Sequence, residues 1–209
     1  MLETADLECQ RGDRLLFSGL VLRVAPGVCL HVAGENGSGK TSLLRILCGL
    51  MAPSAGTVRW EGEDIRRLRE AYCEQLAYVG HLNGVKDDLT AAENVHIAAA
   101  IAGWPADDNS VRGALRAFGL AGFENRPARA LSQGQRRRVA LARLPCASAA
   151  RLWILDEPFT ALDTRGVGAL SELIGAHLAR GGTVVLTTHQ DVTLPGRVDR
   201  IDLAVPSHA

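Results

Sequence analysis

The chain has 209 residues, 47% of them hydrophobic, which is enough for one packed α/β domain carrying a small inserted subdomain. Its 23 basic and 23 acidic residues balance to zero formal charge, which argues against a general nucleic-acid binder because such proteins need a basic surface. No apolar run approaches the roughly 20 residues that cross a bilayer, and the acidic N-terminal segment is unlike a secretory signal, so we expect a soluble chain.

The first part of the chain predicts strands on either side of a glycine-rich loop. Apolar and polar residues alternate near the N-terminus, as in half-exposed antiparallel strands, and a mostly apolar run follows. Strands are expected over residues 2–9, 15–24, 28–33, 57–60 and 75–79. Residues 42–50 have the apolar spacing of a helix, so the glycine-rich segment joins a buried strand to a helix.

From residue 90 to about 144 the composition predicts helices, and strands return afterwards. Thr90 and Glu93 have the spacing of a capping box at a helix start. Helices are expected over residues 95–101, 110–118, 133–144 and 167–179. Two apolar runs, 152–155 and 183–187, predict buried strands, and residues 198–205 are expected to close the sheet. The pattern predicts a mostly parallel α/β core with a small β layer and an inserted helical part.

The glycine-rich segment reads GENGSGKT and fits the phosphate-binding pattern G-x-x-x-x-G-K-[ST]. Glycines let backbone N–H groups surround an anion, and the following helix turns its positive end toward it. Lys40 is expected to reach the β and γ phosphates of a nucleotide, and the Thr41 hydroxyl to ligate Mg²⁺. The alternative, a glycine-rich turn with a chance lysine, is disfavoured by the buried strand just before it. The candidate residues are Gly34, Glu35, Asn36, Gly37, Ser38, Gly39, Lys40 and Thr41.

Residues 151–157 read RLWILDE, an apolar strand that ends in two carboxylates. Asp156 is expected to hold Mg²⁺ at the sheet edge, and Glu157 to orient or deprotonate the water that attacks the γ-phosphate. The alternative is two acidic residues at the start of a loop. The presence of Lys40 on a separate strand of the same kind of sheet favours the catalytic interpretation.

Residues 131–135 read LSQGQ and come before a predicted helix. Ser132 fits an N-cap, and Gly134 leaves the helix N-terminus open to an anion. From the residues alone, an ordinary capped helix explains this segment at least as well. The arginines at 136–138 are expected to form a solvated helix face.

The motifs GENGSGKT, LSQGQ, LWILDEPFTALD and TTHQ, in this order, resemble those of the ATP-binding subunits of ABC transporters. The resemblance covers nearly the whole chain. It implies an α/β P-loop NTPase fold, with one ATP-binding domain over residues 1–209, a small antiparallel β layer, and a helical subdomain at about 85–145 inserted in a RecA-like core. It also implies ATP and Mg²⁺ as cofactors.

The same resemblance implies a head-to-tail dimer with a second copy of the chain. Each ATP would lie between the phosphate loop of one copy and the LSxGQ segment of the other. Asp163 would couple the two sites, and His189 would contact the γ-phosphate and support Glu157. The residues that complete the partner's ATP site would be Ser132, Gly134 and Gln135.

Two positions depart from the family's pattern. A glutamine usually follows the strand that here ends at Val79, where it senses Mg²⁺ and the membrane subunit, and His81 stands at the equivalent position. Arg11 stands where an aromatic platform for adenine is usual. Its planar guanidinium can stack on a base, although a turn residue is the alternative.

Longer phrases, including ENV at 93–95, LSQGQRRRVALARL and GGTVVLTTHQ, are similar to the CcmA family, the ATPases of c-type cytochrome biogenesis. That family usually has a glutamine where this chain has Leu82. The resemblance implies membrane subunits resembling CcmB and CcmC, no nucleic-acid partner, and a peripheral place at the cytoplasmic face of the bacterial inner membrane. ATP hydrolysis would power haem export or release of a haem-loaded chaperone. The alternatives are an ABC exporter of another small molecule, a soluble non-transport ABC ATPase, and an ATP-binding module without turnover.

Overall fold

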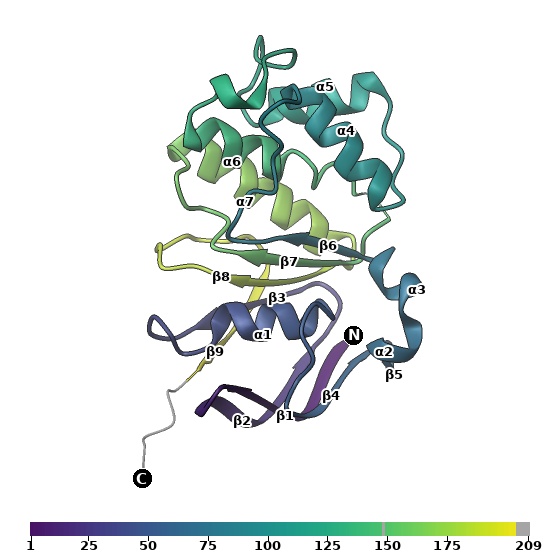
Figure 1. Ribbon diagram of the computed structural model, residues 1–209, viewed down its shortest axis with the longest axis vertical. Coiled ribbons are helices and arrows are strands. Elements are labelled where there is room, and N and C mark those ends of the chain that lie inside the picture. Colours follow the sequence, from purple (N-terminus) through teal and green to yellow (C-terminus); the bar gives the residue numbers. More distant parts are fainter. Residues whose placement is uncertain (148, 204–209) are drawn as a thin grey trace.

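An antiparallel sheet with the strand order β2-β1-β4-β5 forms one layer of the molecule (Figure 1). Its strands are β1 (Leu2–Arg11), β2 (Arg14–Val24), β4 (Ala55–Trp60) and β5 (Glu63–Asp64). The first three confirm the predicted β layer. The two short helices that follow, α2 (Ile65–Leu68) and α3 (Glu70–Cys73), were not predicted, because four residues are too few to show a helical period. The computed structural model describes residues 1–147 and 149–203.

A parallel sheet with the order β6-β7-β8-β3-β9 forms the middle layer. Its strands are β3 (Val28–Ala33), β6 (Leu76–Val79), β7 (Leu152–Asp156), β8 (Thr183–Thr187) and β9 (Arg197–Asp202). Every residue of β7 and β8 is buried, as expected when both faces of a parallel sheet are covered. The strand predicted at 198–205 is confirmed as the edge strand β9, although its last two residues lie outside the described part of the chain.

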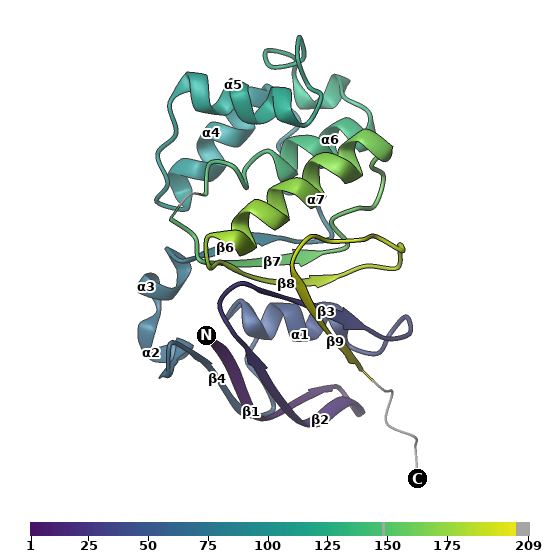
Figure 2. The same cartoon turned by 180° about the vertical axis from the view of Figure 1, so that it is seen from behind.

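Helices cover both faces of the parallel sheet (Figures 1 and 2). Helix α1 (Lys40–Leu47) lies between the two sheets, and the opposite face carries α4 (Ala91–Ile101), α5 (Asp108–Ala117), α6 (Gln133–Leu141) and α7 (Thr164–Ala179). The capping box of Thr90 and Glu93 is present at the start of α4. Helix α6 ends at Leu141 rather than at the predicted 144, because Pro145 has no N–H to donate to the Leu141 carbonyl, which accepts from Leu144 instead. Among the described helices, none combines the length and apolar character needed to cross a bilayer.

Two hydrophobic clusters form the core, one on each side of the parallel sheet. One surrounds α1 and includes Trp60 from the antiparallel sheet. The other lies between the parallel sheet and the helices and includes Trp153 on β7 and Trp104 after α4. The indole N–H of Trp104 donates to the Glu74 carbonyl at 2.9 Å, which attaches the end of α4 to the segment before β6. The parallel sheet is therefore covered by apolar side chains on both faces.

The buried His177 on α7 stacks on Trp153, with ring centroids 3.9 Å apart and an interplanar angle of 10°. Burial, and secondly the nearby Arg180 charge, lowers the pKa of His177 from 6.5 to about 4. Since the unfolded chain binds a proton more readily than the native chain between these values, stability must decrease as the pH falls through this window.

We predict that the free energy of unfolding falls by up to ~3 kcal/mol between pH 6.5 and pH 4 through His177 alone. Denaturant unfolding at several pH values measures this fall. His177→Phe keeps an aromatic ring against Trp153 but removes the titrating group, so its stability should fall less over the same range. Equal falls in the variant and the wild type would contradict the assignment.

Candidate active site

The phosphate-binding loop joins β3 to α1 at the centre of the molecule. The Lys40 ammonium donates to the carbonyls of Gly34 and Glu35 at 2.7 and 2.9 Å, so the loop wraps around it. Gly34 has φ +142°, and a Cβ there would stand 2.7 Å from the Ser38 hydroxyl and 2.8 Å from the Leu203 carbonyl. Only glycine fits this position, so the tight path of the loop at its first residue requires it.

The Asp156 carboxylate ends β7 and is 2% exposed. Its Oδ2 accepts a hydrogen bond from the Thr41 hydroxyl at 2.9 Å, and its Oδ1 accepts one from the Thr187 hydroxyl at 2.8 Å. Thr41 and Asp156 are 115 residues apart in the sequence. The structure therefore brings together the two residues that were both predicted to hold Mg²⁺. The groups that meet are a hydroxyl and a carboxylate.

Glu157 has φ +49°, a left-handed conformation that costs a residue with a side chain roughly 1–2 kcal/mol. Its N–H donates to the Thr187 hydroxyl at 2.9 Å, which compensates part of this cost. The His189 N–H donates to Glu157 Oε2 at 3.3 Å, and the His189 imidazole Nε2 lies 3.5 Å from Oε1. The carboxylate predicted to be catalytic and the histidine predicted to support it are thus in contact.

One cleft of about 720 Å³ is lined by Lys40, Thr41, Asp156, Glu157 and His189 together. Both tentative residues, Arg11 at the end of β1 and His81 after β6, also line it, so the sequence-predicted positions converge there. Its volume lies in the range of ligand sites.

A neighbouring cleft of about 940 Å³ is lined by His31, Arg200 and Asp202 and shares His189 with the first. Lys40 and Asp156 are not among its lining residues, although it is the larger of the two. We therefore place the reactive site in the smaller cleft, where the loop lysine and both carboxylates meet.

Four predicted residues lie away from this cleft: Ser132, Gly134, Gln135 and Asp163. Ser132 and Gln135 form a capping box at the start of α6, and Asp163 caps α7 by accepting from the Gly166 N–H at 2.8 Å. A Cβ at Gly134 would stand 2.8 Å from the Ala161 carbonyl, so close packing inside the chain already requires glycine there. The described part of one chain therefore does not bring these four to the Lys40 cleft.

Two residues that matter for the site were not assigned a role from the sequence. Thr187 bonds Asp156 and Glu157 at once, and its position as the last residue of an apolar strand was the available signal. Arg137 was expected on a solvated face but is 4% exposed, which corrects that expectation. The signal was the spacing, because apolar Ala140 and Leu141 follow at i+3 and i+4 and share its helix face.

A sequence profile described as ABC transporter matches residues 17–160. The cytochrome c biogenesis ATP-binding export protein CcmA of Nitrosomonas europaea is 53% identical over 194 residues, which cover 93% of this chain and 91% of that protein. The protein of the same name from Nitrosospira multiformis is 52% identical over 203 residues, 97% of this chain and 98% of its own. This chain belongs to the CcmA family of ABC transporter ATPases. Membership of the family makes it an ATP-binding subunit that hydrolyses ATP.

Solved structures of the ABC family share the fold. The ATP-binding subunit of an ABC transporter superimposes with a TM-score of 0.78 at 28% identity, over 90% of this chain and 79% of that one. A bacterial ABC transporter cassette, solved as a dimer, has a TM-score of 0.83 at 24% identity, over 97% of this chain and 95% of its own. The predicted ABC ATPase fold is therefore confirmed.

Replacing Thr187 by valine tests the hydrogen bonds that join β8 to the two carboxylate residues. We predict a loss of about 2–4 kcal/mol of unfolding free energy, because Thr187→Val leaves a buried carboxylate oxygen and an N–H without partners. The matched control is Thr183→Val at the other end of β8, whose hydroxyl makes a single 3.4 Å contact, and which should cost less than about 1 kcal/mol. Denaturant unfolding compares the two, and equal losses would contradict the role given to Thr187.

Proposed function

We propose that this chain is the ATP-hydrolysing subunit of a membrane ABC complex for c-type cytochrome biogenesis, powering haem export or release of a haem-loaded chaperone. The carrying observation is the 53% identity to the CcmA protein of Nitrosomonas europaea over 93% of the chain. The cleft where Lys40, Asp156, Glu157 and His189 meet supports turnover rather than binding alone.

The loop at residues 34–41 would bind the phosphates of ATP. Its N–H groups and the N-terminus of α1 supply partial positive charge, and the Lys40 ammonium adds a full charge beside them. Arg11, at the end of β1, and Arg14, at the start of β2, line the same cleft. Both precede the loop in the sequence, whereas Asp156 follows it. Arg11 is our candidate to stack on the adenine through its planar guanidinium.

The residues fit a bound Mg²⁺ ion. The Thr41 hydroxyl and the Asp156 carboxylate lie 2.9 Å apart beside the loop, and a hard cation prefers such oxygen donors. When bound, the ion would neutralise charge that develops on the phosphates. The buried Asp156 is held from β8 as well, so its carboxylate keeps a fixed orientation for this task.

Glu157 would orient or deprotonate the attacking water. Its carboxylate lies one residue beyond Asp156 and lines the same cleft as Lys40. Its contacts with His189 hold the side chain from one side, and the bond from its N–H to Thr187 holds the backbone. A general base fixed in this way typically contributes 10²–10⁴-fold in rate.

The active form would be a head-to-tail dimer of two copies. Within one chain, the Ser132–Gln135 segment lies at the start of α6 and outside the lining of the Lys40 cleft. This supports its use by the opposite copy, where the N-terminus of α6 would present positive charge to ATP. Asp163, 3.8 Å from Arg138 of α6, would couple the two ATP sites of the dimer.

The membrane subunits, resembling CcmB and CcmC, would dock beside the His81–Leu82 turn. A cleft of about 580 Å³ there is lined by Leu50, His81, Leu82 and Arg143. Leu82 and Leu50 are 82% and 65% exposed and line the same cleft, so together they offer apolar surface to a partner. We infer that residues 85–145 act as a helical subdomain beside this cleft, and that the protein is peripheral at the cytoplasmic face of the inner membrane.

We expect Glu157→Gln to bind ATP, to hydrolyse it at least about 100-fold more slowly, and to accumulate as an ATP-bound dimer. Single-turnover hydrolysis and size-exclusion chromatography with ATP measure both effects. Glu172→Gln on the exposed side of α7 is the matched control and should behave as the wild type. If Glu157→Gln stayed monomeric with ATP bound and hydrolysed it at the normal rate, the proposed role of Glu157 would be contradicted.

The cytochrome assignment is tested in cells whose only copy of the gene carries Glu157→Gln. Haem staining of c-type cytochromes should be lost, and the wild-type chain should restore it. Normal staining with a variant already shown to be inactive would remove the cytochrome role while leaving the ATPase in place.

Ser132→Arg separates binding from turnover. We expect the isolated monomer to bind ATP with unchanged affinity, because Ser132 lies outside its own Lys40 cleft, and turnover to be abolished because the arginine obstructs the opposite site. Fluorescent-nucleotide titration and steady-state hydrolysis give the two values. Ser110→Arg, at an exposed position of α5, is the control, and loss of ATP binding in the Ser132 variant would contradict the dimer arrangement.

A further inference from the structure

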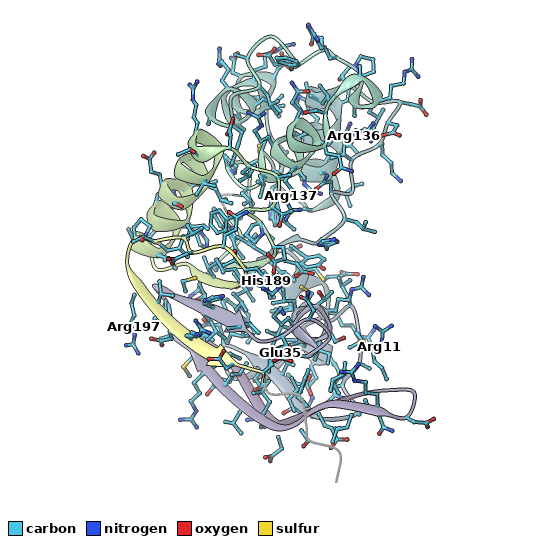
Figure 3. The ribbon with its side chains drawn as sticks, turned by 90° about the vertical axis from the view of Figure 1, so that its left-hand side faces the viewer. Arg11, Glu35, Arg136, Arg137, His189 and Arg197 are labelled. Atoms are coloured by element: carbon cyan, nitrogen blue, oxygen red, sulfur yellow. The ribbon has the colours of Figure 1, made fainter. Side chains whose placement is uncertain are left out.

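Arg137 lies on α6 and points into the middle of the molecule. Figure 3 shows it between the helices and His189, whereas Arg136 lies farther out among the helices. Its Nη1 donates to the Gly80 carbonyl at 2.9 Å and to Asn83 Oδ1 at 3.2 Å. Its Nη2 donates to the carbonyls of Asp156 at 2.9 Å and Glu157 at 2.7 Å. One guanidinium therefore joins three separate parts of the chain.

A charge buried this deeply is costly unless it is hydrogen-bonded. Each of the two Nη atoms of Arg137 donates to two acceptors, while its buried Nε has no partner among the described residues. Burial lowers the pKa of Arg137, and the Asp156 and Glu157 carboxylates act in the opposite direction, so the guanidinium stays charged. Three of its four acceptors are backbone carbonyls, which it can hold without competing for the carboxylate oxygens. The arrangement therefore fixes main-chain positions and leaves the Glu157 side chain free to act.

The two segments that Arg137 joins have different tasks under the proposed function. One is the end of β7, where Glu157 has a left-handed backbone whose N–H is already held by Thr187. The other is the turn from Gly80 to Asn83, which carries His81 and the exposed Leu82. The Glu157 N–H is thus bonded to Thr187 and the Glu157 carbonyl to Arg137. The guanidinium that bonds this carbonyl also bonds the Gly80–Asn83 turn.

We propose that Arg137 is a positioning residue, which sets the backbone of Glu157 and couples it to the turn at Gly80–Asn83. This inference rests on the proposed function. Movement of the turn toward or away from the core would change the hydrogen bonds of the same guanidinium that holds Glu157. Hydrolysis would thereby respond to the position of the turn, without Arg137 touching the nucleotide.

The neighbouring arginines do not share this geometry. Arg136 pairs with Asp87 at 2.6 Å and Arg138 lies 3.8 Å from Asp163, both with partly exposed side chains. Only a planar fork reaches four acceptors at once, so a lysine at 137 can replace the charge but not the set of bonds. The substitution Arg137→Lys therefore separates charge from geometry.

The test compares Arg137→Lys and Arg137→Gln with Arg129→Gln. Arg129 is the control because it makes one exposed ion pair, with Asp88, which follows the same turn in the sequence. For both Arg137 variants we expect kcat to fall at least about tenfold, with the KM for ATP and the monomer's affinity for a fluorescent ATP analogue within about twofold of wild type. The control should change neither value.

Amide hydrogen exchange without nucleotide gives a readout that does not depend on turnover. Peptides covering residues 79–84 and 155–160 should exchange faster in Arg137→Lys than in the wild type, while peptides of α1 should not change. If Arg137→Gln does not fold, Arg137→Lys decides the result by itself. A kcat within twofold of wild type, a parallel loss of ATP affinity, or unchanged exchange in both segments would overturn the proposal.

These outcomes remain distinct from failure of the proposed function. A wild-type chain without ATP turnover, alone and with its membrane subunits, would count against the function. The exchange of the two segments would then still show whether Arg137 holds them together.

Discussion

The buried Asp156 carboxylate is the constraint on which the arrangement of the site depends. A carboxylate at the end of a fully buried strand is stable only if both oxygens find donors. Hydroxyls from α1 and β8 supply them, so the phosphate-binding helix, the interior strand β7 and its neighbour β8 are fixed to one another at a single group. The rest of the cleft inherits its geometry from this point, because Lys40 precedes Thr41 and Glu157 follows Asp156.

Immediately after this group the backbone enters a conformation that it would not adopt alone. The left-handed Glu157 is held at its N–H by Thr187 and at its carbonyl by Arg137, so contacts from β8 and α6 jointly determine it. Local strain of this kind persists only where surrounding structure over-determines it. The effect is to present a carboxylate toward the Lys40 cleft from a rigid support rather than from a flexible loop.

Sequence reasoning predicted the site where local patterns carry the information. The glycine-rich loop, the apolar strand ending in Asp156 and the capping box at Thr90 each depend on a few adjacent residues, and the structure has all three. The burial of Arg137 was misjudged although the apolar residues at i+3 and i+4 indicated it, whereas its hydrogen-bond partners lie 57 and 19–20 positions away, which no local pattern shows. Gly134 is a mixed case, since packing against Ala161 explains it within one chain, and the role in a second copy remains a proposal.

The three tryptophans of the chain are distributed one to each structural layer. Trp60 belongs to the antiparallel sheet, Trp153 to the parallel sheet, and Trp104 follows α4 in the helical layer. Their surroundings also differ, because Trp153 alone lies flat against an imidazole. Intrinsic fluorescence of variants that keep a single indole would therefore report each layer separately, with emission from Trp153 sensitive to the ionisation of the ring beneath it. The molecule thus carries its own spectroscopic labels for following how motion passes from one layer to another.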